Sequence, residues 1–217
     1  MTPLALAVAL ASASFAPIQD MDTEELLGKM RQVYRETKTA SFQTKSSINE
    51  RGEKIVVTLN GEFANPNKMR VSFVGLPSGE ATLICDGKEV AIVIEGQAKR
   101  GLEYSVDNLG KSLFANLETL CFFDWKRQLS TAEGGNMKSS KLKVVKEDWN
   151  GKSWLVLEEH AEMQRVDVRY FIDPETFYIW RTISTMIGEK EPFMDAQVLR
   201  LEVNKPLDDK LFVIPKK

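Results

Sequence analysis

The sequence has few residues that could carry out acid–base or metal chemistry. Its 217 residues include one histidine, His160, and two cysteines, Cys85 and Cys121. Most enzyme mechanisms need a group that titrates near neutral pH, and His160 lies within the acidic stretch 158–162, where we interpret it as a solvated surface residue. A zinc site would have to combine the three residues without the ligand spacing of zinc proteins. We therefore predict that the chain is not an enzyme and binds no metal or cofactor.

An excess of one charge is also missing. The chain has 29 basic and 31 acidic residues, a formal net charge of -2 and a pI near 5.7. This balance gives no summed field that would attract nucleic acid or anionic lipid headgroups. Glycine-rich phosphate loops and nucleophile elbows are absent as well. We expect no nucleic-acid partner and no catalytic role for the chain.

Long hydrophobic runs are lacking. The apolar run around residues 4–10 is followed by small residues at 11–13, and at roughly ten residues it is too short for a bilayer, which takes ~20. This pattern is typical of a secretory signal peptide. We expect residues 1–20 to be that peptide, cleaved near 13–16, and residues 21–217 to form one domain in the periplasm or otherwise exported. Because no Lys or Arg precedes the run, an upstream start or an uncleaved, disordered tail are open alternatives.

The sequence is compatible with either a disulfide or two free thiols at the two cysteines. An oxidising compartment would allow Cys85 and Cys121 to pair, yet both lie in apolar surroundings, where a buried thiol behaves as a small hydrophobe.

What the sequence does contain is one amphipathic helix followed by many alternating strands. Asp22 precedes Glu25 at capping-box spacing, and apolar residues then recur at helical spacing, which predicts a helix over 23–37. Beyond it, large apolar residues from Phe42 to Phe73 alternate with polar ones, as in strands with one buried and one solvent-exposed face. Asp86-Gly87 and Asn150-Gly151 indicate hairpin turns. Further strands are predicted at 82–85, 90–94, 102–106, 141–147, 153–159, 165–172, 177–187 and 195–203.

Between Asp107 and Trp125 the apolar residues recur at helical spacing instead of alternating. We therefore predict a second helix that interrupts the strands. About ten antiparallel strands must close or nearly close, and the two helices would cover the open side. The candidate binding residues are apolar positions of the strands and of this covering segment: Leu59, Phe63, Met69, Val71, Phe73, Leu113, Phe114, Leu117, Phe122, Phe123, Trp125 and Trp180. The segment 109–125 either plugs the barrel or forms the lid of an apolar cavity, in which acyl chains would gain ~0.8 kcal/mol per buried methylene.

The order of elements resembles the LolA-like family of periplasmic lipoprotein carriers and its exported relatives. The resemblance depends on six segments: LLGKMRQVY at 26–34, NPNKMRV at 65–71, CDGK at 85–88, FIDPET at 171–176, IWR at 179–181 and LFVIP at 211–215. It implies an α+β, mainly β fold, an unclosed antiparallel β-barrel of about ten or eleven strands covered by two or more helices.

The resemblance also implies a function. It is that of a carrier whose hydrophobic concave face receives the acyl chain of a lipid or lipoprotein, with a membrane or protein acceptor for the cargo and no cofactor. We expect such a carrier to be a monomer. The alternative is a periplasmic sensor or protein-interaction module built on the same fold.

Overall fold

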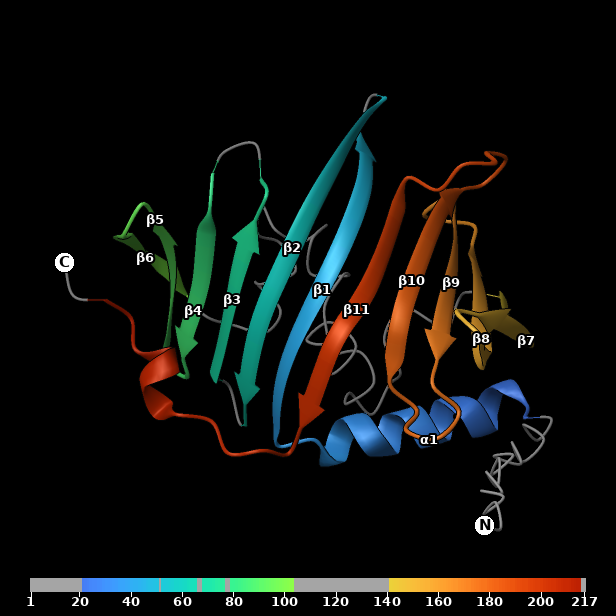
Figure 1. The fold of residues 1–217 in the computed structure, drawn as a ribbon, viewed down its shortest axis with the longest axis horizontal. Coiled ribbons are helices and arrows are strands. Elements are labelled where there is room, and N and C mark those ends of the chain that lie inside the picture. Colours follow the sequence, from blue (N-terminus) through green and yellow to red (C-terminus); the bar gives the residue numbers. More distant parts are fainter. Residues whose placement is uncertain (1–20, 51, 66–67, 77–78, 104–140, 216–217) are drawn as a thin grey trace, which may run out of the picture.

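The structure is a computed structural model that describes residues 21–50, 52–65, 68–76, 79–103 and 141–215. Most of these residues belong to one antiparallel sheet of eleven strands, drawn in Figure 1. The strands are β1 (Thr39–Glu50), β2 (Glu53–Ala64), β3 (Lys68–Val74), β4 (Ala81–Asp86), β5 (Glu89–Ile94), β6 (Gln97–Glu103), β7 (Lys141–Trp149), β8 (Lys152–Ala161), β9 (Val166–Ile172), β10 (Ile179–Met186) and β11 (Met194–Val203).

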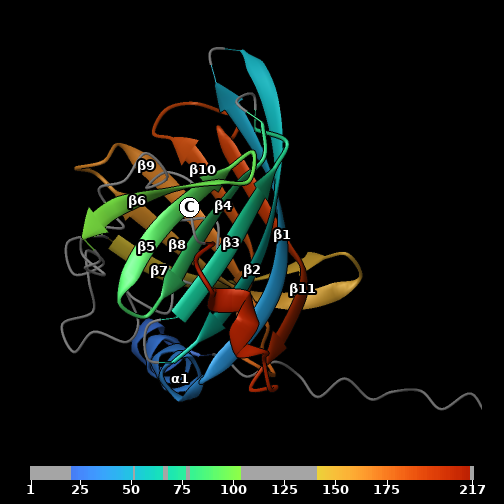
Figure 2. The ribbon, with the colours of Figure 1, turned by 90° about the vertical axis from the view of Figure 1, so that its left-hand side faces the viewer.

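The strand order is β6-β5-β4-β3-β2-β1-β11-β10-β9-β8-β7. The first six strands meander away from β1, and the last five return from the far edge until β11 pairs with the other side of β1. Strands β6 and β7 are therefore the two ends of the order, and the sheet is open. Figure 2 shows how the sheet curls, which gives it an inner and an outer face. The predicted unclosed antiparallel fold is confirmed.

Alternation of side chains sets the two faces. In β2, Val57, Leu59, Gly61 and Phe63 are buried, while the residues between them are less so. Register carries this face across the sheet, because residues opposite each other on neighbouring strands lie on the same side. Ala40 of β1 pairs with Phe63, and so belongs to the same inner face. The predicted strand alternation thus becomes one continuous surface.

Helix α1 (Thr23–Glu36) closes one end of the inner face. Asp22 caps it, with its Oδ1 accepting a hydrogen bond from the backbone N–H of Glu25 at 2.8 Å. Its apolar stripe belongs to the same buried cluster as the inner face and consists of Leu26, Leu27, Met30 and Tyr34. Figure 1 shows α1 lying across the lower ends of β9 and β10. The predicted helix over 23–37 is confirmed to within one residue.

The tight hairpin turns lie where the sequence has residues that readily adopt positive φ. Asn150 and Gly151 have φ of 52° and 73° and join β7 to β8 as predicted, with the two positive values that a type I′ turn requires. The hairpin at 86–87 is shifted by one residue, because Asp86 ends β4 and its carboxylate accepts from the N–H groups of Lys88 and Glu89. This bonding lowers the pKa of Asp86. The loop itself is Gly87 and Lys88.

Residues with positive φ explain three of the differences between the predicted and the observed strand bounds. Glu95 and Gly96, with φ of 50° and 75°, make a turn that the sequence reading missed, so β6 begins at Gln97 rather than at 102. Arg165 and Phe177 have φ of 56° and 58°, outside the range of a strand, so β9 and β10 begin later than predicted.

The predicted second helix at 107–125 lies outside the described residues. In the described part, α1 is accompanied by a short 3-10 helix, η2 (Asp209–Phe212), which packs against β3 and β4. Ile214 after it packs on Ile84 and Ala91 of the outer face, and Lys68 forms an ion pair with Asp209 at 2.8 Å. No helix among the described residues has the length and apolar character needed to cross a membrane.

Candidate binding surface

The inner face is the surface that strand alternation in the sequence predicts to be apolar. Its predicted residues on β2 and β3 are all buried, none more than 8% exposed, and all belong to one cluster: Leu59, Phe63, Met69, Val71 and Phe73. Register places Leu59 opposite Phe73, and Phe63 opposite Met69. The structure therefore brings these five residues together on one side of the sheet.

The second half of the sheet contributes to the same face. Residues Leu155 and Leu157 of β8, Tyr170 and Ile172 of β9, and Ile179 of β10 join the cluster that contains the β2 and β3 residues. The sequence reading assigned none of them to the site. Residues 154–157 form an unbroken apolar run, Trp-Leu-Val-Leu, and both faces of β8 are buried there, so alternation gave no face to choose.

Trp180 has an intermediate position. It is the bulge residue of β10, because the register with β9 shifts between Ile179 and Arg181. Its partly buried side chain packs against both the inner cluster and an outer cluster formed by Trp154, Val156 and Phe171. The indole Nε1 is buried and has no hydrogen-bond partner among the described residues. The predicted residues of the covering segment, Leu113, Phe114, Leu117, Phe122, Phe123 and Trp125, lie outside the described residues.

Two tyrosines fix α1 to the end of the inner face. The hydroxyl of Tyr34 accepts a hydrogen bond from the backbone N–H of Ile179 at 3.1 Å, and the ring of Tyr34 meets that of Tyr178 edge-on at 5.2 Å between centroids. The hydroxyl of Tyr178 is hydrogen-bonded to that of Thr37 at 2.7 Å. Burial raises the pKa of both tyrosines, Tyr34 more strongly. Both phenols therefore stay neutral well above physiological pH.

A polar patch interrupts the inner face near its middle. Thr44 and Ser46 of β1 and Thr182 and Ser184 of β10 are buried to 6% exposure or less. The sequence reading missed these four residues. A signal was present, because Thr44 and Ser46 share the parity of Phe42 and Ile48, which were assigned to a buried face.

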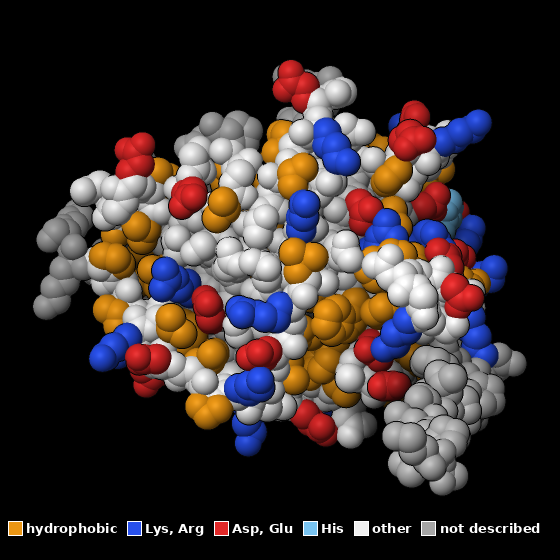
Figure 3. Space-filling view, in the orientation of Figure 1, with side chains coloured by type: hydrophobic (Ala, Val, Ile, Leu, Met, Phe, Trp, Pro, Cys, Tyr) orange, Lys and Arg blue, Asp and Glu red, His pale blue; other side chains and the backbone are white. Residues whose placement is uncertain are grey.

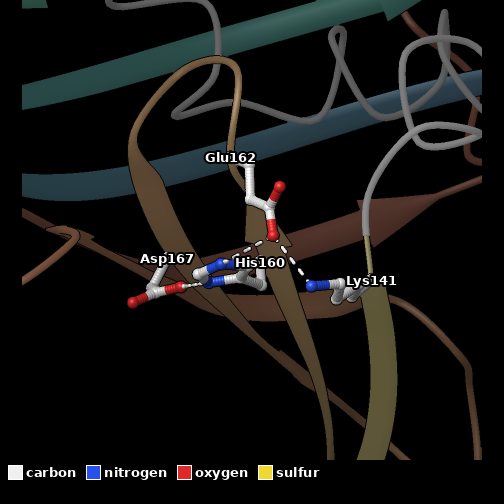
Figure 4. Close-up of polar contacts among 4 residues, drawn as sticks. All are labelled: Lys141, His160, Glu162 and Asp167. Carbon is white, nitrogen blue, oxygen red and sulfur yellow. Dashed lines mark hydrogen bonds and ion pairs between the residues drawn. The ribbon is translucent and has the colours of Figure 1, made fainter.

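His160 belongs to a chain of polar contacts at the end of the β8–β9 hairpin, shown in Figure 4. Its Nδ1 lies 2.6 Å from the Asp167 carboxylate, and its Nε2 lies 3.7 Å from Glu162. Lys141 of β7 forms an ion pair with Glu162 at 2.8 Å, which raises the pKa of Lys141 and lowers that of Glu162. The His160 side chain is 38% exposed, so these contacts tie the strand ends together at the surface.

Cys85 is fully buried in the inner cluster, and burial raises the pKa of its thiol. A thiol held in the protonated form is a poor nucleophile and a poor metal ligand. Cys121, the other cysteine of the predicted pair, lies outside the described residues. Within the described ranges, no group of three or more His, Cys, Asp or Glu residues could hold a metal ion.

The outer face has a different character. Figure 3 views the molecule from this side, where acidic and basic side chains are interspersed with apolar areas, the broadest of them near the middle of the view. Arg181 binds Asp195 through two hydrogen bonds of 2.9 and 2.7 Å, and its guanidinium also lies over the rings of Trp149 and Phe171. These contacts anchor charged side chains along the sheet. The outer face has an apolar cluster of its own, in which Trp149 and Trp180 pack against Trp154, Val156 and Phe171.

No protein-family model matches the chain, and no curated protein matches it in sequence. Solved structures are similar in fold. An uncharacterized conserved protein from Thermus thermophilus aligns with a TM-score of 0.56 at 9% identity over 89% of this chain and 94% of that chain. The Mycobacterium tuberculosis lipoprotein LppX aligns with a TM-score of 0.51 at 10% identity, over 86% and 98%.

The LolA superfamily protein NE2245 from Nitrosomonas europaea aligns with a TM-score of 0.45 at 10% identity, over 90% and 99%. At such identities the likeness concerns the fold alone. The unclosed antiparallel sheet that the LolA-like resemblance implies is the one observed.

Proposed function

We propose that this protein is an exported, non-enzymatic carrier that holds the acyl chain of a lipid or lipoprotein against the inner face of its open sheet. The observation that carries the proposal is the buried apolar cluster on the inner face, to which β2, β3, β4, β8, β9 and β10 all contribute. Both halves of the sheet contribute to it, although residues 104–140 separate them in the chain. An acyl chain has the shape and the chemistry to lie along such a face.

The chemistry around the face supports a binding role. The ionisable groups in the cluster are three tyrosines and Cys85. Burial raises the pKa values of Tyr34, Tyr178 and Cys85, which keeps them protonated, and the hydroxyl of Tyr170 donates a hydrogen bond to Glu159 at 2.8 Å. His160 stands apart in surface contacts with Asp167 and Glu162. A general base needs to reach the proton it abstracts, and the buried residues of the inner cluster are apolar side chains, phenols and one thiol.

Two measurements test the proposal directly. The mature protein is purified and extracted with solvent, and the extract is analysed for lipid by mass spectrometry. Binding is then measured by displacement of a fluorescent fatty acid. We expect bound lipid and saturable displacement. Absence of both would contradict the carrier, and a stable protein complex recovered without lipid would favour the interaction module.

A matched pair of variants connects the binding to the inner face. Val71 and Val74 both belong to β3, but Val71 is 3% exposed in the inner cluster while Val74 is 38% exposed on the other side. Val71→Thr keeps the shape and adds a hydroxyl that opposes an acyl chain. We expect this variant to lower the affinity for the fluorescent fatty acid several-fold. Val74→Thr is the control, which should leave that affinity unchanged. Equal affinities in both variants would place the binding elsewhere.

A further inference from the structure

The four buried hydroxyl residues of the inner face lie around one small side chain. Ser46 of β1 pairs with Ala196 of β11, which pairs in turn with Thr182 of β10. Ser46 and Thr182 are therefore two strand spacings apart, about 10 Å, with only a methyl group between them. Thr44 and Ser184 are the next residues of the same parity on their strands. We call these four residues the hydroxyl patch.

Two hydroxyls of the patch have no partner within the described part of the protein. The Oγ1 of Thr44 and the Oγ of Ser46 are buried and make no hydrogen bond to any described residue, although the residues are 1% and 0% exposed. A buried polar group without a partner is costly, and valine or alanine at these positions would avoid the cost. The indole Nε1 of Trp180, two residues before Thr182, is a third buried polar atom without a hydrogen-bond partner among the described residues.

The backbone around the patch is irregular. The register between β1 and β11 shifts at Gln43 and Thr44, and that between β10 and β9 shifts around Trp180. Bulges of this kind redirect side chains and are frequent beside functional sites. Thr44 and Trp180, which lie at these irregularities, each have a buried side-chain polar atom without a hydrogen-bond partner among the described residues.

We propose that the hydroxyl patch binds a neutral hydrogen-bond acceptor of the cargo, an ester carbonyl, so that the protein selects acyl esters. This inference rests on the proposed carrier function and names the chemical class of its ligand. Two hydroxyls and an indole N–H can all donate, and an ester carbonyl only accepts.

The surroundings of the patch decide against a charged group. Its direct neighbours across the strands are all uncharged: Val57, Leu59, Val168, Tyr170, Met194, Ala196 and Val198. A free carboxylate would be buried there without a cation, at a far higher cost than an ester.

The test compares three ligands of equal chain length: a long-chain acyl methyl ester, the methyl ether of the corresponding alcohol, and the alkane. Each displaces the fluorescent probe from the purified full chain. One net hydrogen bond corresponds to a preference of about threefold to tenfold. We expect the ester to bind that much more tightly than the ether and the alkane. Equal binding of all three would overturn the hydroxyl patch as a subsite and leave the carrier function intact, while binding of none would overturn both.

A double variant assigns the preference to the patch. Thr44→Val with Ser46→Ala removes both unpaired hydroxyls while nearly keeping their volumes. We expect it to fold, to bind the alkane at least as tightly as before, and to lose the preference for the ester. The matched control is Ser72→Ala with Thr82→Val, which removes a pair of hydroxyls 3.0 Å apart on the outer face. A preference that survives the inner variant, or falls equally in the control, would overturn the inference.

Discussion

At the scale of single residues, Tyr34 shows how the end of the inner face is held together. Its hydroxyl is the acceptor for the backbone N–H of Ile179, and it lies in full burial between the helix and β10. Removing that oxygen would leave a buried N–H without a partner. The tyrosine therefore acts through a hydrogen bond as well as through its packing against Tyr178.

The raised pKa of Tyr34 has a predictable effect on stability. Because the folded-state pKa lies above the ordinary value near 10, folding favours the protonated phenol. The stabilisation is complete below the ordinary pKa and is lost as pH rises from there towards the folded-state value. We predict that Tyr34→Phe lowers the free energy of unfolding by about 1–3 kcal/mol at pH 7 and flattens its decline above about pH 10. Denaturant unfolding across this range measures both, and an unchanged slope in the variant would contradict the account.

The hydroxyl patch illustrates what single residues add that a pattern does not reveal. Apolar alternation identified Leu59 and Val71, because large apolar residues on one parity are typical of a buried face. Thr44 and Ser46 share the parity of such a face, yet their side chains are equally typical of exposed strand positions. Their burial follows from the pairing of β1 with β11, which joins residues about 150 positions apart in the chain. Nothing local in the sequence indicates that pairing.

At the scale of elements, glycine shows how context decides the effect of one residue. Gly61 in β2 faces the ring of Phe42, which a Cβ at position 61 would overlap. Gly28 in α1 is exposed, and a Cβ there would meet no atom within 4 Å. The two glycines therefore serve opposite tests of the packing.

We predict that Gly61→Ala destabilises the protein by about 1–3 kcal/mol, because the buried Phe42 ring has little room to move. Gly28→Ala is the control, and should stabilise the protein by about 1 kcal/mol through helix propensity. Thermal or denaturant unfolding of both variants measures the difference. If Gly61→Ala left the free energy of unfolding unchanged, the close contact between the Phe42 ring and position 61 would be contradicted. A smaller cost in a Phe42→Leu background would identify the ring as the cause.

The elements were largely predictable, and the exceptions have physical reasons. Helix α1 follows from its capping residue and apolar stripe, and the β7–β8 turn from Asn150-Gly151. The β5–β6 turn was missed because Glu95 has no preference for positive φ, although Gly96 follows it. The face of β8 was not predictable, since the run 154–157 buries both sides of the strand.

At the scale of the whole molecule, the open sheet is the property that connects fold to function. The chain leaves β1 in one direction, continues to β6, and returns from β7 to place β11 beside β1. Each half of the sheet supplies part of one apolar face, so the surface exists only when both halves have formed. The number of strands and the open architecture were predictable from the alternation and the LolA-like resemblance. The order in which the halves meet came from the structure.

The central claim is that the inner face holds acyl chains, and the most direct measurement is the affinity of the purified protein for saturated acyl ligands of increasing length. Each buried methylene contributes ~0.8 kcal/mol, so we predict that affinity rises about tenfold for roughly every two methylenes until the face is filled. Displacement of the fluorescent fatty acid measures the series. Affinity that does not change with chain length, or no saturable binding at any length, would contradict the account.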